Sequence, residues 1–266
     1  EVRGTAAHLT LDSPHNSNAI SSTLVAQLHE GLERAAVDPA ARVVVLGHTG
    51  GTFCAGADLS EASGAPESSG ASGGDGAAAG SAEEQAARRT RVFVGLLRAI
   101  LAHPKPVIAA VDGHVRAGGM GLVAACDLAV AGPASTFALT EVRLGLAAAM
   151  ISVPLAARVA PRELARALLT GERFDAAHAR EIGLLTEAVD DPGPAVDRLV
   201  ESFRPCSPQG LAENKALLNA ALLAELDRRG EELAGVTARL FGTPEVAEGM
   251  SAFLQRRQPS WAVAPE

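Results

Sequence analysis

The sequence predicts an α/β fold with a helical C-terminal part, and three observations support this prediction. Residues 42–47 and 106–111 are apolar runs rich in β-branched side chains, as expected for strands buried on both faces. Apolar residues at helical spacing lie between such runs, so strands and helices alternate early in the chain. The last third, residues 208–257, has several helical patterns and little strand signal. We therefore expect a core at 1–200 and a helical part at 201–266.

The N-terminal elements begin with a short strand, which is predicted at residues 8–12. Ser21 or Ser22 is a suitable N-cap for the helix that follows. The apolar side chains of that helix are spaced four residues apart on one face, at Leu24, Leu28 and Leu32. The strand at 42–47 then leads directly into a loop of small residues.

Residues 62–82 are almost wholly Gly, Ala, Ser and acidic residues. Such a segment buries little apolar surface, so we expect a mobile insertion, either a flap over a pocket or a tolerated surface loop. Helical spacing returns at 83–101, where Val92, Leu96 and Ile100 align.

The second half of the chain starts with the strand at 106–111, which leads into a second loop of small residues. The elements expected next are an apolar helix at about 118–126 and short strands at 128–131 and 136–139. Beyond residue 147 the pattern is mostly helical. Pro161 is well placed to begin a helix and Gly171 to follow the end of one.

Composition excludes several classes of function. The net charge of −8 and the lack of a basic cluster with aromatic residues argue against a nucleic-acid partner. No uncharged apolar run reaches the length of about 18 residues that a membrane-spanning helix needs. The N-terminus lacks a signal-peptide pattern, so a cytoplasmic protein is expected, with Cys54, Cys126 and Cys206 reduced. The seven histidines show no metal-ligand spacing, and we expect no metal.

The two small-residue loops, 52–59 and 117–121, are the strongest chemical signal. Small residues after a strand let a ligand approach backbone N–H groups. Two such loops can direct two donors at one oxygen, which stabilises an oxyanion without a charged side chain. The pair therefore indicates chemistry on a carbonyl group.

A dinucleotide-binding site is a weaker alternative. Gly119, Gly121 and Ala124 match a relaxed form of the glycine fingerprint, with Glu141 downstream. That fingerprint requires its first glycine directly at the end of a strand, and the acid at the end of the next one. Here residues 112–116 intervene, and no second βαβ unit surrounds Glu141.

Several short motifs occur in order over nearly the whole chain. They are LTLDSP at 9–14 with NAI at 18–20, FCAGADL at 53–59, KPVIAAVDG at 105–113, GG at 118–119, ACD at 125–127, FALTEVRLG at 137–145 and EGMSAFL at 248–254. Together they resemble the enoyl-CoA hydratase/isomerase (crotonase) superfamily. The resemblance implies a crotonase-type superhelix of ββα turns with a helical C-terminal trimerisation part, in a homotrimer or a dimer of trimers. It also implies an acyl-CoA substrate, with coenzyme A as the carrier part of that substrate and no prosthetic group.

The resemblance also assigns site residues by position. The oxyanion-hole donors are the backbone N–H groups of Ala57 and Gly118, and Gly118 starts a helix whose positive end favours the enolate oxygen. The residues expected to contact coenzyme A are Ala55, Ala57, Asp58, Leu59 and Gly118, with Phe253 and Arg256 from the C-terminal part.

One departure from the family pattern bears on the reaction. Hydratases of the family carry two glutamates, and this chain has Gly121 at the first position and Glu141 at the second. Apolar neighbours are expected to raise the pKa of Glu141, which suits an acid/base near neutral pH. The alternative is a structural carboxylate, for instance one paired with Arg143. We expect an enoyl-CoA hydratase; a Δ3,Δ2-enoyl-CoA isomerase and a catalytically silent CoA-binding paralogue remain alternatives.

The remaining candidates are peripheral. Arg116 can bind a substrate carboxylate, but a surface position or a pairing with Asp112 is the favoured interpretation. His114 is expected to be a turn or core histidine and Cys54 a packing residue. The acyl pocket is expected at residues 146–150, where the alanines 147–149 depart from the Pro and Gly of many relatives.

Overall fold

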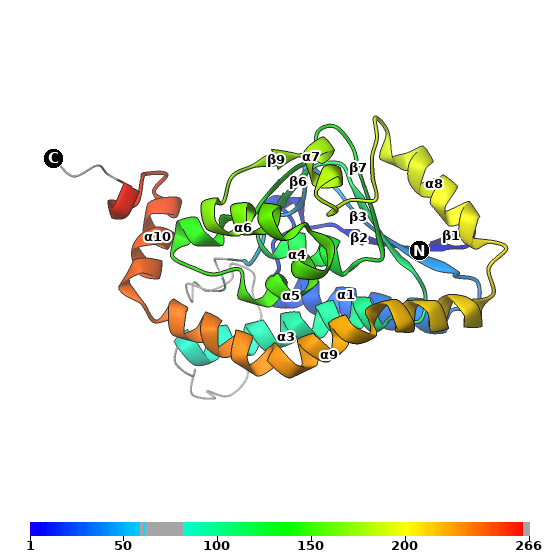
Figure 1. The fold of residues 1–266 in the computed structure, drawn as a ribbon, viewed down its shortest axis with the longest axis horizontal. Coiled ribbons are helices and arrows are strands. Elements are labelled where there is room, and N and C mark those ends of the chain that lie inside the picture. The colour runs from blue at the N-terminus through cyan, green and yellow to red at the C-terminus, as the bar shows by residue number, and fades with distance from the viewer. Residues whose placement is uncertain (59–60, 62–81, 263–266) are drawn as a thin grey trace, which may run out of the picture.

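The computed structural model describes residues 1–58, 61 and 82–262. The predicted insertion therefore lies, apart from Ala82, outside the described residues, as does Leu59. Within these ranges, two sheets and a set of helices form the α/β architecture that the sequence predicts (Figure 1).

The larger sheet has the strand order β1-β2-β3-β5-β7-β10. Its strands are β1 (Val2–Arg3), β2 (Ala6–Leu11), β3 (Val43–His48), β5 (Val107–Val111), β7 (Leu128–Ala131) and β10 (Glu187–Ala188). All neighbours pair parallel except β1 with β2. The apolar runs of the sequence supply its centre, where both faces are covered.

The smaller sheet has the order β4-β6-β8-β9. Its strands are β4 (Thr52–Cys54), β6 (His114–Arg116), β8 (Thr136–Ala138) and β9 (Phe174–Asp175). The chain passes from β3 to β4, from β5 to β6 and from β7 to β8, so each turn adds one strand to each sheet. With the helices that follow, these turns form the predicted superhelix of ββα units.

The helices are α1 (Ser22–Val37), α3 (Ala82–Ala102), α4 (Gly118–Ala125), α5 (Ala149–Arg158), α6 (Pro161–Thr170), α7 (Ala176–Glu181), α8 (Pro192–Phe203), α9 (Pro208–Phe241) and α10 (Pro244–Leu254). Short 3-10 turns lie at Pro14–Asn16, Thr140–Leu144 and Ser260–Ala262. The predicted caps are present: the Ser21 side chain accepts from the Leu24 N–H, and Gly171 ends α6 in a left-handed conformation.

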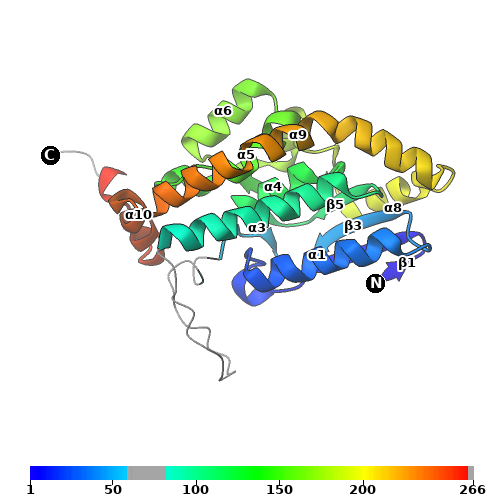
Figure 2. The same ribbon diagram turned by 90° about the horizontal axis from the view of Figure 1, so that it is seen from below.

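Helices cover both faces of the larger sheet. α1, α3 and α9 lie side by side on one face (Figure 2). Val44 and Leu46 of β3 face the main core on that side. Val43 and Val45 point to the other face, where they pack with Val196 of α8. The alternation along β3 confirms that this strand is buried on both faces.

The predicted alignment on α3 is wrong in one position. Val92 is 49% exposed, whereas Phe93, Leu96, Leu97 and Ile100 are buried. A strict spacing of four residues drifts around a helix that has 3.6 residues per turn. The buried stripe therefore passes between positions 96 and 97 and includes Phe93.

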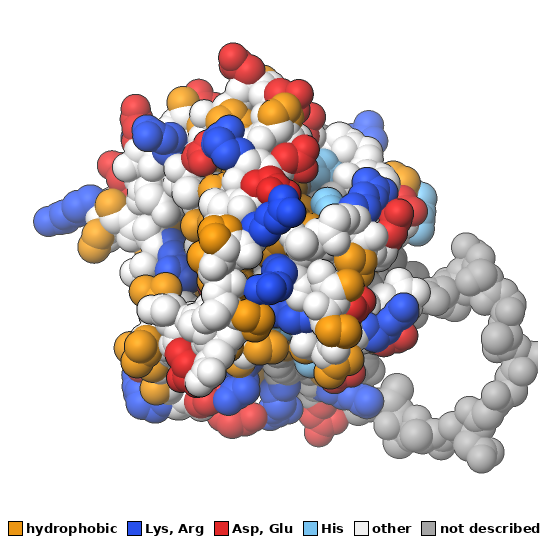
Figure 3. All heavy atoms as spheres, turned by 90° about the vertical axis from the view of Figure 1, so that its right-hand side faces the viewer, with side chains coloured by type: hydrophobic (Ala, Val, Ile, Leu, Met, Phe, Trp, Pro, Cys, Tyr) orange, Lys and Arg blue, Asp and Glu red, His pale blue; other side chains and the backbone are white. Residues whose placement is uncertain are grey.

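The surface at the end of the molecule that carries the N-terminus and α8 has acidic and basic side chains interspersed (Figure 3). Such a surface offers no extended field of one sign to a charged polymer. In the described part of the chain, no helix is both long and apolar enough to span a membrane.

Candidate active site

The two small-residue loops meet in the structure, as the sequence predicts. Gly56 has φ +92°, and a Cβ atom added there would lie 2.7 Å from the Ala117 Cβ and 3.6 Å from the Gly118 nitrogen. A Cβ on Gly119 would lie 2.9 Å from the carbonyl oxygen of Cys54. Glycine is therefore required on both sides, because a Cβ atom at either position would overlap with the opposite loop.

The two predicted oxyanion donors line one cavity. Among the described residues, the N–H groups of Ala57 and Gly118 find no backbone acceptor. Both residues border a cavity of about 740 Å³. Gly118 is the first residue of α4, so its N–H is one of the unsatisfied donors of a helix N-terminus. Ala117 before it has φ 48° and ψ −122°, a strained conformation for alanine next to a functional donor.

Asn18 fixes the position of the first loop. Its side chain is fully buried, and its Nδ2 donates to the carbonyls of Thr49 and Thr52 at 3.1 and 2.8 Å. Its Oδ1 accepts from the Ser13 N–H at 2.6 Å. Its backbone has φ 53°, a region that asparagine tolerates better than most residues. This role of Asn18 was not predicted from the sequence, where the signal for it is an asparagine in the turn before the helix.

Glu141 lies in the 3-10 turn after β8 and lines the same cavity as Ala57 and Gly118. Its Oε2 atom is buried and has no hydrogen-bond partner. Burial is the main cause that raises the pKa of Glu141 to about 7. The alternative pairing with Arg143 is wrong, because the Arg143 Nε donates to the carbonyl of Thr170 at 3.2 Å. A buried carboxyl that has one oxygen without a partner and a pKa near neutral pH is suited to proton transfer.

Gly121 leaves no room for a second carboxylate. A Cβ added at Gly121 would lie 2.2 Å from the Ile151 Cγ2 and 2.9 Å from the Ile151 Cβ. Ile151 belongs to α5 and is buried. The space that a side chain at position 121 would need is thus filled by a side chain from another helix. Among the described residues that line the cavity, Glu141 is the acid with a buried oxygen that has no hydrogen-bond partner.

Arg116 does not pair with Asp112. Its Nη1 donates to the carbonyl of Thr136 and to that of Val115, at 2.6 and 2.9 Å, and its Nη2 donates to the Thr136 Oγ1 at 2.8 Å. The pairing of Arg116 with Asp112 that the sequence favoured is therefore wrong. Arg116 is half-buried and lines the cavity.

Most of the described residues that were predicted to contact coenzyme A line the cavity, and Arg256 does not. Ala55 and Asp58 line the cavity close to Ala57, and the Asp58 Oδ2 accepts from the Asn16 Nδ2 at 3.1 Å. Phe253 of α10 also lines it and is 60% exposed. Arg256 is exposed just beyond α10 and is not among the residues that line this cavity.

The predicted acyl pocket lies mostly on the same cavity. Leu146, Ala147, Ala148 and Met150 line it, whereas Ala149 is buried as the first residue of α5. These apolar side chains lie next to Glu141 in sequence, so the turn that presents the carboxyl also supplies apolar wall.

Other candidate residues do not add chemistry to the cavity. Cys54 is fully buried, and burial raises the pKa of its thiol to about 12, which leaves no thiolate at neutral pH. His114 is exposed, and its Nδ1 lies 2.9 Å from the Thr136 Oγ1. Gly119 and Gly121, the proposed dinucleotide fingerprint, pack inside α4 against Cys54 and Ile151. Within the described ranges, no group of three His, Cys, Asp or Glu side chains is placed to hold a metal ion.

Comparisons with known proteins identify the family and the fold of the chain. A family model described as enoyl-CoA hydratase/isomerase matches residues 1–263. The crystal structure of an enoyl-CoA hydratase from Mycobacterium avium is similar, with 53% identity, a TM-score of 0.86, and coverage of 97% of this chain and 94% of that one. An enoyl-CoA hydratase/isomerase from Marinobacter aquaeolei has 31% identity and a TM-score of 0.72 over 99% and 98% of the two chains. The mitochondrial enoyl-CoA hydratase domain-containing protein 3 of Danio rerio is 31% identical over 98% of this chain and 86% of its own length.

Proposed function

The chain belongs to the enoyl-CoA hydratase/isomerase family, and from this premise we propose that it is an enoyl-CoA hydratase-like enzyme acting on a 2-enoyl-CoA thioester. The observation that carries the proposal is the Glu141 carboxyl, whose buried Oε2 has no hydrogen-bond partner, in one cavity with two backbone donors that find no backbone acceptor. Family membership alone does not define the reaction, because the family name covers hydratases and isomerases.

In the proposed reaction, the thioester carbonyl oxygen accepts hydrogen bonds from the N–H groups of Ala57 and Gly118. Their polarisation of the carbonyl makes Cβ electrophilic and stabilises the enolate that forms when water adds there. Loss of one such donor typically costs about 3 kcal/mol of transition-state stabilisation. The α4 N-terminus adds partial positive charge at the same oxygen.

Glu141 performs both proton transfers in this scheme. Its carboxylate removes a proton from the water as the oxygen bonds to Cβ, and the resulting carboxylic acid gives that proton to Cα. The C=C bond is consumed, one C–O and one C–H bond form, and Glu141 returns to its starting state. A pKa of about 7 keeps both forms accessible at neutral pH.

The contact between Gly121 and Ile151 favours an isomerase as the second candidate. An isomerase needs no activated water, so one carboxylate is sufficient. Glu141 would remove a proton from C2 of a 3-enoyl thioester or from C4 of a 2-enoyl thioester, and return it to the other carbon. The same two N–H groups would hold the dienolate oxygen.

We further propose that coenzyme A binds along Ala55, Asp58 and Leu59, with Phe253 and Arg256 contributing from the C-terminal part, and that the chain assembles as a homotrimer or a dimer of trimers. Leu217 and Leu218 of α9, 76% and 79% exposed, are apolar side chains available for such an assembly. Sedimentation equilibrium on the purified protein tests the assembly; a monomer at micromolar concentration would contradict it.

An assay with crotonyl-CoA and with a 3-enoyl-CoA separates the candidates. Wild type is expected to hydrate crotonyl-CoA, and Glu141→Gln to lose about 10²- to 10⁴-fold in kcat, the usual contribution of a general acid/base. Glu201→Gln, at an exposed glutamate on α8, is the matched control and should keep the wild-type rate.

The outcomes differ clearly. Conversion of the 3-enoyl to the 2-enoyl thioester without hydration identifies the isomerase. If several chain lengths give neither reaction while coenzyme A still binds, the chain is a silent CoA-binding paralogue and both enzymatic candidates fail.

A further inference from the structure

Two arginines lie on one face of the smaller sheet, with a small residue between them. Arg116 of β6 pairs with Ala138 of β8, and Thr136 of β8 pairs with Asp175 of β9. Arg173 directly precedes β9, so the same antiparallel register brings it opposite Ala138. Ala138 has no side chain beyond Cβ, which leaves space between the two guanidinium groups.

The Arg116 guanidinium is held in a fixed orientation by neutral acceptors. Its hydrogen bonds go to the carbonyls of Val115 and Thr136 and to the Thr136 hydroxyl, so its charge is not neutralised. Burial, together with the nearby charge of Arg173, lowers the pKa of Arg116. In the part of the chain that the structure describes, neither Arg116 nor Arg173 has a carboxylate within ion-pair distance. Arg116 is half-buried and Arg173 is exposed, and two neighbouring like charges with no ion-pair partner favour an anion between them.

This pair of arginines borders the same cavity as the candidate catalytic residues. Arg116 and Arg173 both line the cavity that also contains Glu141, Ala57 and Gly118. The pKa of Glu141 is raised by burial, and no arginine is among the causes of its shift. Because one cavity holds the arginines and the candidate oxyanion donors, an anion bound by the arginines and the thioester can belong to one ligand.

We propose that Arg116 and Arg173 bind a carboxylate at the distal end of the acyl chain, so that the substrates are CoA thioesters of dicarboxylic acids. This inference rests on the proposed function for the position of the thioester at Ala57 and Gly118. Guanidinium groups bind carboxylates through paired, charge-assisted hydrogen bonds, which gives both affinity and geometric selectivity. Arg143 also lines the cavity, but its Nε is directed to the Thr170 carbonyl.

The test measures binding of two saturated thioesters by calorimetry: glutaryl-CoA, which ends in a carboxylate, and pentanoyl-CoA, which has the same chain length without it. Neither can be hydrated, so the measurement is independent of turnover. Wild type should bind glutaryl-CoA at least about tenfold more tightly, the contribution typical of a charge-assisted pair. Arg116→Gln and Arg173→Gln should each reduce this ratio towards one.

A matched control and a second ligand make the test specific. Arg166→Gln removes an arginine that is paired with Glu172 nearby, and it should keep the wild-type ratio. Free coenzyme A distinguishes a carboxylate site from a phosphate site. If the arginine variants weaken free coenzyme A as much as glutaryl-CoA, the arginines bind a CoA phosphate and the proposal is overturned. Equal affinity of wild type for the two thioesters also overturns it.

Two further features keep the result interpretable. Arg173 makes no hydrogen bond within the described residues, so Arg173→Gln tests the site even if Arg116→Gln disturbs the fold through Thr136. Selective binding of glutaryl-CoA by a protein that neither hydrates nor isomerises crotonyl-CoA, a 3-enoyl-CoA or a 2-enoyl-CoA ending in a carboxylate rejects the proposed function and keeps this inference. Hydration or isomerisation without selective binding of glutaryl-CoA rejects this inference and keeps the proposed function.

Discussion

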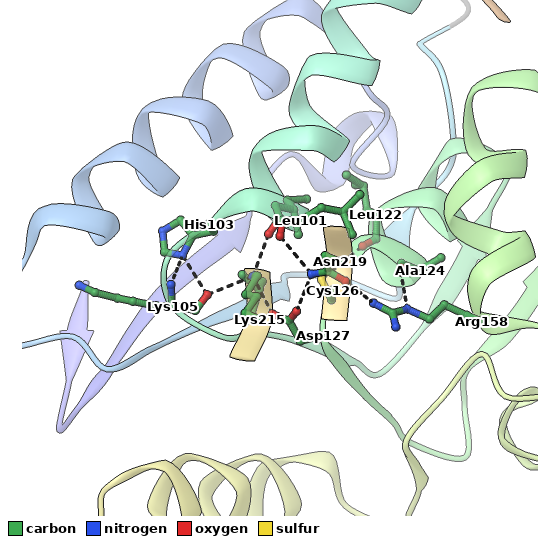
Figure 4. A network of polar contacts seen from close by, with 12 residues as sticks. Leu101, His103, Lys105, Leu122, Ala124, Cys126, Asp127, Arg158, Lys215 and Asn219 are labelled. Carbon is green, nitrogen blue, oxygen red and sulfur yellow. Dashed lines mark hydrogen bonds and ion pairs between the residues drawn. The ribbon is translucent and has the colours of Figure 1, made fainter. Parts of the chain in front are cut away.

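Lys215 and Glu141 are both largely buried ionisable residues, but they differ in their hydrogen-bond partners. Lys215 of α9 is 4% exposed, and its Nζ contacts the Asp127 Oδ2 at 2.7 Å and the carbonyls of Ile100 and Lys105 at 2.9 and 3.1 Å. Asn219, one turn further along α9, donates to the Leu101 carbonyl and to the Asp127 Oδ1 (Figure 4). Glu141, by contrast, has a buried oxygen with no partner.

The difference separates a structural group from a functional one. The network of Lys215, Asp127 and Asn219 satisfies its polar atoms within the protein, so it joins α9 to the end of α3 and to the start of β7. The buried Oε2 of Glu141 has no such compensation, so the carboxylate keeps the free-energy cost of its burial. A proton taken from a bound ligand would remove that cost. The desolvation of Lys215 is compensated by hydrogen bonds and that of Glu141 is not. This difference indicates that Glu141, rather than Lys215, belongs to a functional site.

The largest expected effect on stability comes from breaking the Lys215 network. Lys215→Met should lower the free energy of unfolding by about 3–5 kcal/mol, because Asp127 loses its buried partner. Chemical denaturation measures the change. Arg98→Met, which removes an exposed ion pair between α3 and α9, is the control and should cost about 0–1 kcal/mol. Equal losses in the two variants would show that the buried network has no special role.

The next largest effect on stability is expected from the desolvation of the Glu141 carboxylate. Its pKa is raised in the folded state from 4.5 to about 7, so ionisation disfavours the fold as pH rises through this window. Glu141→Gln should therefore be more stable than wild type by about 3 kcal/mol at pH 8, with the difference vanishing below pH of about 4.5. Denaturation curves at both pH values measure it. A difference that does not depend on pH would mean that Glu141 is not desolvated.

A smaller effect tests the packing that excludes a second carboxylate. Gly121→Ala should destabilise the protein by about 1–3 kcal/mol, because the added methyl group overlaps with Ile151. Ile151→Ala in the same chain removes the closest atom, so the two substitutions should cost less together than the sum of the single changes. A double-mutant cycle measures this coupling. Additive costs would indicate that the contact does not close the site.

Much of the fold was predictable because its strands have strong local patterns. The run at 42–47 and the run at 106–111 became β3 and β5 within one residue at each end. Strands β4, β6 and β9 were not predicted, since two or three residues are too few to show an alternation. They form because neighbouring turns of the superhelix bring their edges together, which is information about tertiary structure.

The sequence predicted the two loops of the site and Glu141. It did not predict the contact between Gly121 and Ile151 or the partner of Arg116. The two glycine-containing loops signalled that backbone donors converge, and the structure brings the loops together. The contact between Gly121 and Ile151 joins residues from different helices, so no local pattern reports it. The partner of Arg116 was missed for the same reason, because Thr136 lies on the adjacent strand.

The most direct test of the central claim is exchange of the α-protons of butyryl-CoA with deuterium oxide, followed by NMR. This reaction needs the two N–H donors and one base, and it needs no added water or double bond. Wild type is expected to catalyse exchange with a rate that rises with pH around an apparent pKa of about 7. Glu141→Gln is expected to lose exchange while it still binds the thioester. Exchange that persists at the wild-type rate in Glu141→Gln would contradict the assignment of Glu141 as the group that moves the proton at Cα.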